Sequence, residues 1–250
     1  MTKAKEFTWA LQVSGQKIDI DDTLALYGEN SDPSIHQMNG GDGQLVTVLT
    51  SPQFELLSTA TEVDEVATRL LKIINGTLFV VDPGRAPLAS GGIRKRSPNG
   101  GWDYHLVAGT GHIISRSRAR GVGVAIINGE PSPEHTCSPA AARWSAAAHS
   151  DQTVSDVLMY LSGEPDWFNF YKAFELMRDD INKRGEGRHR QQQMGWPAKK
   201  DLDHFTLSAQ VYRHAPPWKG GYTPARAMPL NKAARYIQSL VATWLTWRFP

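Results

Sequence analysis

A short basic segment near the C-terminal end of the chain has the composition of a phosphate-binding loop. Its two glycines, Gly185 and Gly187, let the backbone bend toward a ligand. Arginine forms paired, charge-assisted hydrogen bonds with phosphate oxygens, so arginines around such a bend can follow a nucleic-acid backbone. A solvated basic surface is the alternative that the pattern leaves open. The residues predicted to contact nucleic acid here are Lys183, Arg184, Arg188 and Arg190.

Arginine and histidine also occur together twice in this part of the chain. Arg184 is followed after a short interval by His189, and Arg213 is followed directly by His214. When RNA is cleaved without a metal ion, an arginine can stabilise the charge on the phosphorane while a histidine transfers a proton. His214, Arg213, His189 and Arg184 are therefore the candidate catalytic residues. The alternative for Arg213 and His214 is that both side chains bind the last carbonyls of a helix.

Two further basic groups lie earlier in the chain, among segments with strand periodicity. The first is Arg94, Lys95 and Arg96, and the second is Arg116, Arg118 and Arg120. The spacing of two residues places all three arginines of the second group on one face of a strand, where we predict nucleic-acid contacts. Tryptophan rings nearby in the sequence could stack on bases; these are Trp102, Trp196 and Trp218. An edge strand protected by charge is the alternative.

The sequence contains no motif that identifies a metal site or a cofactor. Cys137 is the single cysteine, which excludes an intramolecular disulfide and a cysteine-based zinc site. His105 and His112 lack a clear third ligand. Asp179 and Asp180 could bind Mg²⁺, but a salt bridge between helices is the favoured interpretation. We therefore expect no metal and no cofactor, and whether the protein is an enzyme stays open.

The distribution of charge separates the last part of the chain from the rest. The formal net charge is only +2, yet residues 178–250 contain 13 Lys/Arg against 5 Asp/Glu, and residues 1–177 contain 14 against 20. A positive C-terminal field favours a polyanion such as RNA, or an acidic protein surface. No run approaches the roughly 20 apolar residues that a membrane span needs, and the N-terminus lacks the apolar stretch of a signal peptide. We expect a cytoplasmic protein of a bacterium or its phage, with no membrane contact; the oligomeric state stays open.

Alternating apolar residues predict strands in the first half of the chain. We expect strands over residues 7–13, around Ile18 and Ile20, and over 45–50, 77–81, 102–108, 112–117 and 122–127, with a loop over 27–44. One helix is predicted over 62–74, capped by Thr61 with Asp64 in the capping-box position and ended by Asn75-Gly76.

The second half of the chain has helical periodicity throughout. Residues 130–138 break the strand pattern, Ser138-Pro139 is typical of a helix start, and Pro165-Asp166 opens another helix. The predicted fold class is α+β, with a mainly antiparallel sheet and one or two helices followed by an all-α helical bundle. The predicted domains are residues 1–135 and 136–250.

The last third of the chain resembles the C-terminal helical region of an uncharacterised bacterial protein family. The matching residues are Asp166-Trp167, Tyr171-Lys172, Glu175, Phe205-Thr206, Ala209, Arg213-His214-Ala215 and Trp244-Leu245. An Arg-His pair on an all-helical unit is also remotely similar to the HEPN superfamily. That resemblance implies a metal-independent ribonuclease or an RNA-binding domain of a defence or toxin system, including phage defence.

Three functions follow from these patterns. The first is binding of nucleic acid or phosphate groups through the basic C-terminal helical domain. The second is a HEPN-like ribonuclease that needs no metal. The third is a non-catalytic regulatory protein that binds another protein.

Overall fold

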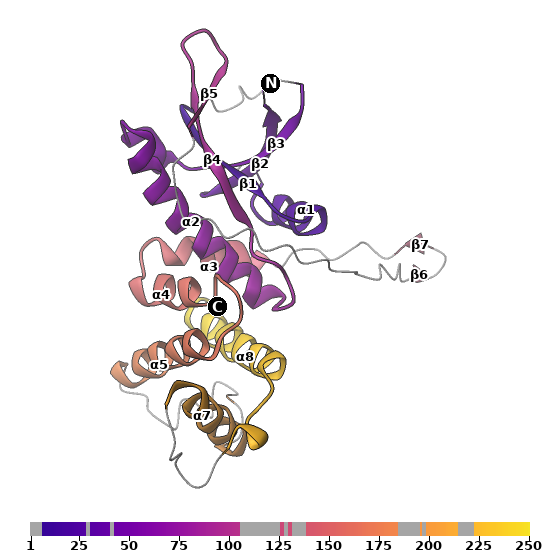
Figure 1. The fold of residues 1–250 in the computed structure, drawn as a ribbon, viewed down its shortest axis with the longest axis vertical. Coiled ribbons are helices and arrows are strands. Elements are labelled where there is room, and N and C mark those ends of the chain that lie inside the picture. Colours follow the sequence, from indigo (N-terminus) through magenta and orange to yellow (C-terminus); the bar gives the residue numbers. More distant parts are fainter. Residues whose placement is uncertain are drawn as a thin grey trace.

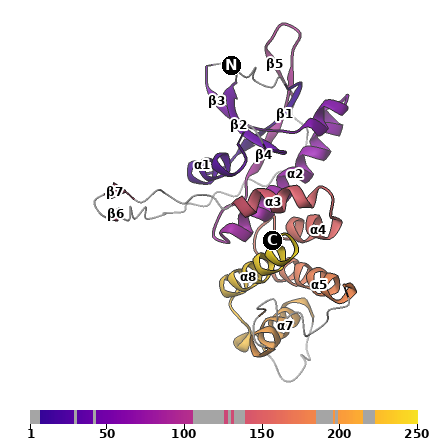
Figure 2. The same cartoon turned by 180° about the vertical axis from the view of Figure 1, so that it is seen from behind.

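The computed structural model describes residues 7–28, 31–40, 43–105, 126–127, 130–131, 139–184, 196, 199–214 and 223–250. The fold is α+β, as predicted: the sheet belongs to the N-terminal half, and most helices belong to the C-terminal half. Figure 1 shows the sheet at one end of the longest axis and α7 (Lys199–Arg213) at the other, and Figure 2 shows the same arrangement from behind.

The N-terminal sheet has five strands in the order β2-β3-β1-β4-β5, and every neighbouring pair is antiparallel. The strands are β1 (Trp9–Ser14), β2 (Ser34–Asn39), β3 (Leu45–Thr50), β4 (Ala89–Arg96) and β5 (Trp102–His105). Leu11 pairs with Leu49 on one side and Ile93 on the other. Because paired residues share a face, this row forms the buried face of the sheet. Separately, β6 (Ile126–Ile127) pairs with β7 (Glu130–Pro131).

Two N-terminal predictions are wrong, because contacts with the rest of the fold override what the local composition indicates. Residues expected to form a strand around Ile18 and Ile20 instead form helix α1 (Lys17–Leu26). Ile20, Leu24 and Tyr27 recur at helical spacing and pack into the same core, which favours the helix. The segment expected to be a loop over 27–44 contains β2, which pairs with β3 from Ser34↔Thr50 to Asn39↔Leu45.

Helix α2 (Ala60–Val81) is longer than predicted at both ends. Thr59 caps it and forms the capping box with Glu62, in place of the predicted pair Thr61 and Asp64. Nor does the helix end at Gly76, and the strand predicted over 77–81 is its last turns. A Cβ at Gly76 would lie 2.0 Å from the carbonyl oxygen of Leu158, so this glycine permits a close approach between helices.

The remaining strand predictions have mixed outcomes. The strand over 45–50 is confirmed as β3, and the one over 102–108 is confirmed for the four residues of β5. The strand predicted over 112–117 lies outside the described residues. Of the strand predicted over 122–127, the structure describes residues 126 and 127, which form β6.

The C-terminal helices follow the sequence closely. They are α3 (Pro139–Ala148), α4 (Gln152–Tyr160), α5 (Trp167–Lys183), α7, and α8 (Leu230–Arg248), with short 3₁₀ turns η1 (Pro52–Leu56) and η3 (Pro224–Arg226). Asp166 caps α5 through the amide of Asn169, 2.9 Å away, as its position before an apolar stripe predicts. Asp151 caps α4 in the same way.

Two hydrophobic clusters form the interior, and α2 contributes to both. The first half of α2, from Val63 to Ile74, packs with the sheet and α1. Ile73, Phe79 and Val80 pack with the C-terminal helices. The side-chain amide of Gln238 in α8 also donates to the Val80 carbonyl at 2.8 Å. The division into domains 1–135 and 136–250 stays a prediction, and α2 is the element on which it depends.

Two observations concern membrane spans and metal sites. Within the described residues, no helix is long and apolar enough to cross a membrane. The same part of the chain contains no group of three or more His, Cys, Asp or Glu side chains with metal-site geometry.

Candidate functional site

Most of the predicted basic loop lies outside the described residues. Lys183 is an exposed residue in the last turn of α5, and Arg184 is the C-cap of that helix. Six of the residues predicted to bind nucleic acid or to act in catalysis lie outside the described residues; these are Arg188, His189, Arg190, Arg116, Arg118 and Arg120. Their roles, and the pairing of Arg184 with His189, stay predictions.

Arg184 belongs to an ion network that joins the ends of three helices. Its Nε donates to Asp180 Oδ1 at 3.2 Å, and Asp180 also accepts from Trp244 Nε1 at 3.1 Å and from Arg248 Nη1 at 3.3 Å. Arg248 reaches Asp151 as well. Asp180 is therefore occupied by cations, which supports the salt bridge over the Mg²⁺ site. The charge of Arg184 is likewise partly neutralised by the fold.

Arg213 and His214 are placed at the C-terminal end of α7, as predicted. The guanidinium carbon of Arg213 lies 4.2 Å from the ring centre of Tyr171 and 5.9 Å from that of Phe168, both in α5. His214 is exposed, and its backbone amide donates to the Gln210 carbonyl at 3.0 Å. The side chain of Arg213 thus lies against aromatic rings. A catalytic role for either residue stays a prediction.

Arginines and aromatic residues meet on the two strands at the edge of the sheet. Arg94 is paired with Tyr104, and Arg96 with Trp102, across β4 and β5. Ile93, on the opposite face of β4, is fully buried among the sheet and helix residues of the core. Since side chains alternate along a strand, the two pairs lie on the face turned away from that core. We call Arg94, Arg96, Trp102 and Tyr104 the β4–β5 surface.

Each arginine of the β4–β5 surface lies over a ring. The Arg94 guanidinium carbon is 5.3 Å from the ring centre of Tyr104, and that of Arg96 is 5.7 Å from the ring centre of Trp102. On the other face, Lys95 Nζ lies 4.6 Å from the ring centre of Trp9. A cation within about 6 Å of a ring centre is attracted to the ring face. Three successive cations of β4 are therefore held against aromatic rings.

A glycine pair makes room for the Tyr104 ring. Gly92 has a φ of 104°, and a Cβ there would lie 2.8 Å from the Tyr104 hydroxyl oxygen. The hydroxyl donates to the Gly91 carbonyl. Tyr104 nevertheless keeps 47% of its surface exposed, which is high for a large apolar side chain in a sheet. The ring is thus fixed in orientation by the strand and still accessible from solvent.

The described strand residues on this face of the sheet include two arginines and no acidic side chain. The strand residues that share it by pairing include Ala10, Gln12 and His36, and none of these is acidic. Arg94 is oriented by neutral oxygens: its Nη2 and Nε donate to the Gln12 side-chain oxygen at 2.8 and 3.0 Å, and its Nη1 to the Gly40 carbonyl at 3.2 Å. These bonds fix the guanidinium, and Arg94 forms no ion pair with any residue that the structure describes.

The sequence contained part of this signal. Arg94, Arg96 and Trp102 were recognisable as a basic group with a nearby tryptophan. Tyr104 was missed because its relation to Arg94 depends on the strand pairing. Trp196, predicted as a stacking platform, is instead buried in the helical core beside Phe174 and only 8% exposed. Trp218 lies outside the described residues.

The β4–β5 surface combines guanidinium groups with aromatic rings. Fixed guanidinium groups can hold phosphates, and exposed rings can stack on planar bases. His105, the next residue of β5, contacts Trp9 on the opposite face, with ring centres 6.1 Å apart. Comparison of the chain with protein-family models, curated proteins and solved structures found no match. The geometry of the side chains is therefore the basis on which a function can be proposed.

Proposed function

We propose that the protein binds single-stranded nucleic acid on the β4–β5 surface. The observation that carries the proposal is the fixed pairing of Arg94 with Tyr104 and of Arg96 with Trp102, on a face whose described strand residues include no acidic side chain. The class of ligand is the one predicted from the sequence. The proposed contact residues, however, lie on the sheet and not on the C-terminal helices.

The geometry favours a single strand over a duplex. Stacking on Tyr104 or Trp102 requires a base whose face is free, and in a duplex both faces of a base are covered by its neighbours. The cations repeat at every second residue along β4, so they form a row beside the rings. A strand lying along this row can place phosphates against the guanidinium groups while its bases cover the rings.

The proposal is tested by fluorescence anisotropy with a labelled oligouridylate of about 15 nucleotides, the scale of a single binding module. We expect binding at about 50 mM salt that weakens as salt is raised, because phosphate contacts release counterions. Trp102→Ala with Tyr104→Ala should weaken binding by about 1–3 kcal/mol for each base that loses its ring. An oligothymidylate of equal length distinguishes RNA from DNA.

Two controls separate stacking from damage to the fold. Tyr104→Phe keeps the ring and removes the hydroxyl, so its affinity should stay close to that of the wild type. Leu56→Ala removes a side chain that is 85% exposed and lies outside the surface. The absence of wild-type binding at low salt would reject the proposal. Binding of an acidic polypeptide with equal or greater affinity would instead favour the alternative of a protein partner.

A further inference from the structure

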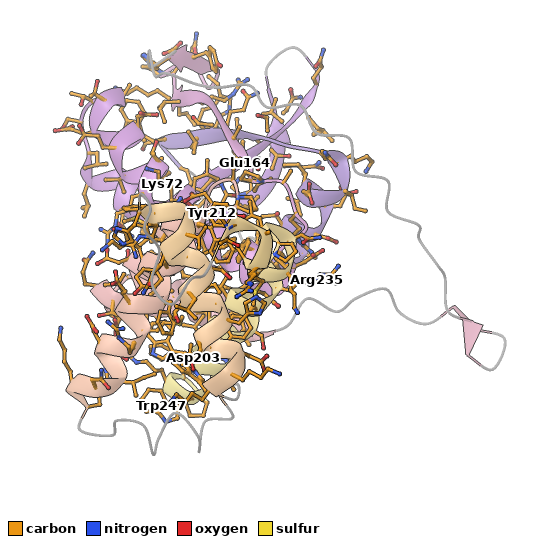
Figure 3. The ribbon with its side chains drawn as sticks, turned by 60° about the horizontal axis from the view of Figure 1, so that its bottom comes forward. Lys72, Glu164, Asp203, Tyr212, Arg235 and Trp247 are labelled. Carbon is orange, nitrogen blue, oxygen red and sulfur yellow. The ribbon has the colours of Figure 1, made fainter. Side chains whose placement is uncertain are left out.

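We infer that a second site for the same single strand lies where α5 begins and α7 ends, in the helical part of the molecule. This inference rests on the proposed function, since it names a second contact for the same ligand. The site consists of Phe168, Tyr171, Tyr212 and Arg213, which we call the α5–α7 surface. Figure 3 labels Tyr212 on the helical end of the molecule, which comes forward in that view.

The packing of two helices brings these residues together. Trp167 in α5 packs on Phe205 in α7, with ring centres 5.6 Å apart, and fixes the contact between the two helices. Tyr212 also stacks on Trp167: the two ring centres are 5.4 Å apart, and the rings are within 7° of parallel. Tyr212 is thus held flat against the bundle, in the orientation that a stacking platform requires.

The rings of the α5–α7 surface remain accessible. Phe168 is 52% exposed and Tyr212 is 53% exposed. Large apolar side chains exposed side by side are characteristic of interaction sites. Because Trp167 covers one face of Tyr212, the exposed part of that ring is available to a second planar group.

The charge of Arg213 is not compensated within the described residues. Arg213 forms no ion pair there; its guanidinium lies between Tyr171 and Phe168 instead. The nearby acidic groups have other partners: Asp166 caps α5, and Glu175 pairs with Lys172 at 3.0 Å. A phosphate is the complementary group for such an arginine, and bases are complementary to the flanking rings.

The two surfaces share one chemistry and lie far apart on the molecule. Each has an arginine against aromatic rings, one on the sheet and one at the contact of α5 with α7, and Figures 1 and 2 show these two helices well apart from β4 and β5. A strand long enough to reach both sites gains a high effective concentration at the second once it has bound the first. A short oligonucleotide can occupy only one site at a time.

The test compares oligouridylates of about 6 and about 40 nucleotides, shorter and longer than a single binding module. We expect Phe168→Ala with Tyr212→Ala to weaken binding of the long strand about tenfold or more, the loss of stacking on one base. The double variant Trp102→Ala with Tyr104→Ala should still bind the short strand weakly at the α5–α7 surface. Adding Phe168→Ala and Tyr212→Ala to it should abolish this remaining binding. Photocrosslinking should join the long strand to peptides containing Tyr104 and to peptides containing Tyr212.

Matched variants keep the outcome interpretable. Phe168→Tyr and Tyr212→Phe preserve the rings and should keep long-strand affinity, whereas Arg213→Ser removes the charge and should reduce it. An unchanged melting temperature shows that each variant is folded. If only the β4–β5 changes weaken binding and no crosslink reaches Tyr212, the inference is rejected and the proposed function stands. If neither pair of changes weakens binding, both are rejected.

Discussion

Arginine has different roles in two regions of the molecule. At the junction of α4, α5 and α8, Arg248 is only 8% exposed and lies between the carboxylates of Asp151 and Asp180. On the sheet, Arg94 is held by neutral oxygens and the ring of Tyr104. Where carboxylates neutralise an arginine, its interactions contribute to the fold. Where rings and amides orient an arginine, as they do Arg94, we propose that its charge interacts with an anionic ligand.

The largest effect is expected in the neutralised network. Asp180→Ala would leave Arg248 buried with one of its two carboxylates and remove the acceptor of Trp244 Nε1, so the free energy of unfolding should fall by about 3–5 kcal/mol. Guanidinium unfolding followed by circular dichroism measures this. Nucleic-acid affinity of the folded variant should not change. Asp179→Ala is the control, because that side chain is 57% exposed. A loss for Asp180→Ala no greater than that of the control would contradict the structural role of the network.

The next effect concerns the helix that joins the two regions. Gly76→Ala places a methyl group against the Leu158 backbone, so α2 and α4 must separate. The expected loss is about 1–3 kcal/mol, typical of overpacking in an interior. Gly163→Ala is the matched control, because a Cβ there meets nothing within 4 Å. Equal melting temperatures for the two variants would mean that the close approach of the helices does not constrain α2.

A smaller effect distinguishes the two kinds of arginine directly. Arg94→Ser should reduce the slope of log affinity against log salt by about 0.7, the value for one phosphate contact on a single strand. Arg184→Ser removes a charge that Asp180 already compensates, so the slope should stay within error of the wild type. Equal changes in slope for both variants would mean that long-range charge, and not the geometry of the β4–β5 surface, determines binding.

The smallest effect is confined to alkaline pH. Tyr27, after α1, hydrogen-bonds to Ser145 in α3, and burial raises the pKa of Tyr27 from 10.0 to about 12. The unfolded chain therefore ionises first, so the stability contributed by the neutral hydroxyl is complete below pH 10 and is lost as pH rises through about 12. Tyr27→Phe should cost about 1 kcal/mol at neutral pH. It should also flatten the decline in stability above pH 10, measured by urea unfolding at a series of pH values.

Several elements were determined by local sequence alone. The helices of the second half combine apolar stripes with caps inside the same short segment, as Asp166 does at the start of α5. The strand over 45–50 has β-branched residues and ends at Ser51-Pro52, so its limits are also local. These features depend on neighbours a few residues away, and the α+β class follows from them.

Other elements were decided only by tertiary structure. Gly76 resembles a helix stop in the sequence, but the backbone of Leu158 packs against it and α2 continues to Val81. Strand β2 lies in a segment rich in turn-forming residues, and its pairing with β3 compensates for that composition.

The β4–β5 and α5–α7 surfaces, where we propose binding, belong to the second kind. Arg94 and Gln12 are separated by 82 positions, and Arg248 and Asp180 by 68, so no local pattern indicates which arginine is oriented by an amide and which is neutralised by a carboxylate. The residue types were visible in the sequence. Their partners were not, because hydrogen bonds and ring contacts depend on distances that only the folded chain establishes.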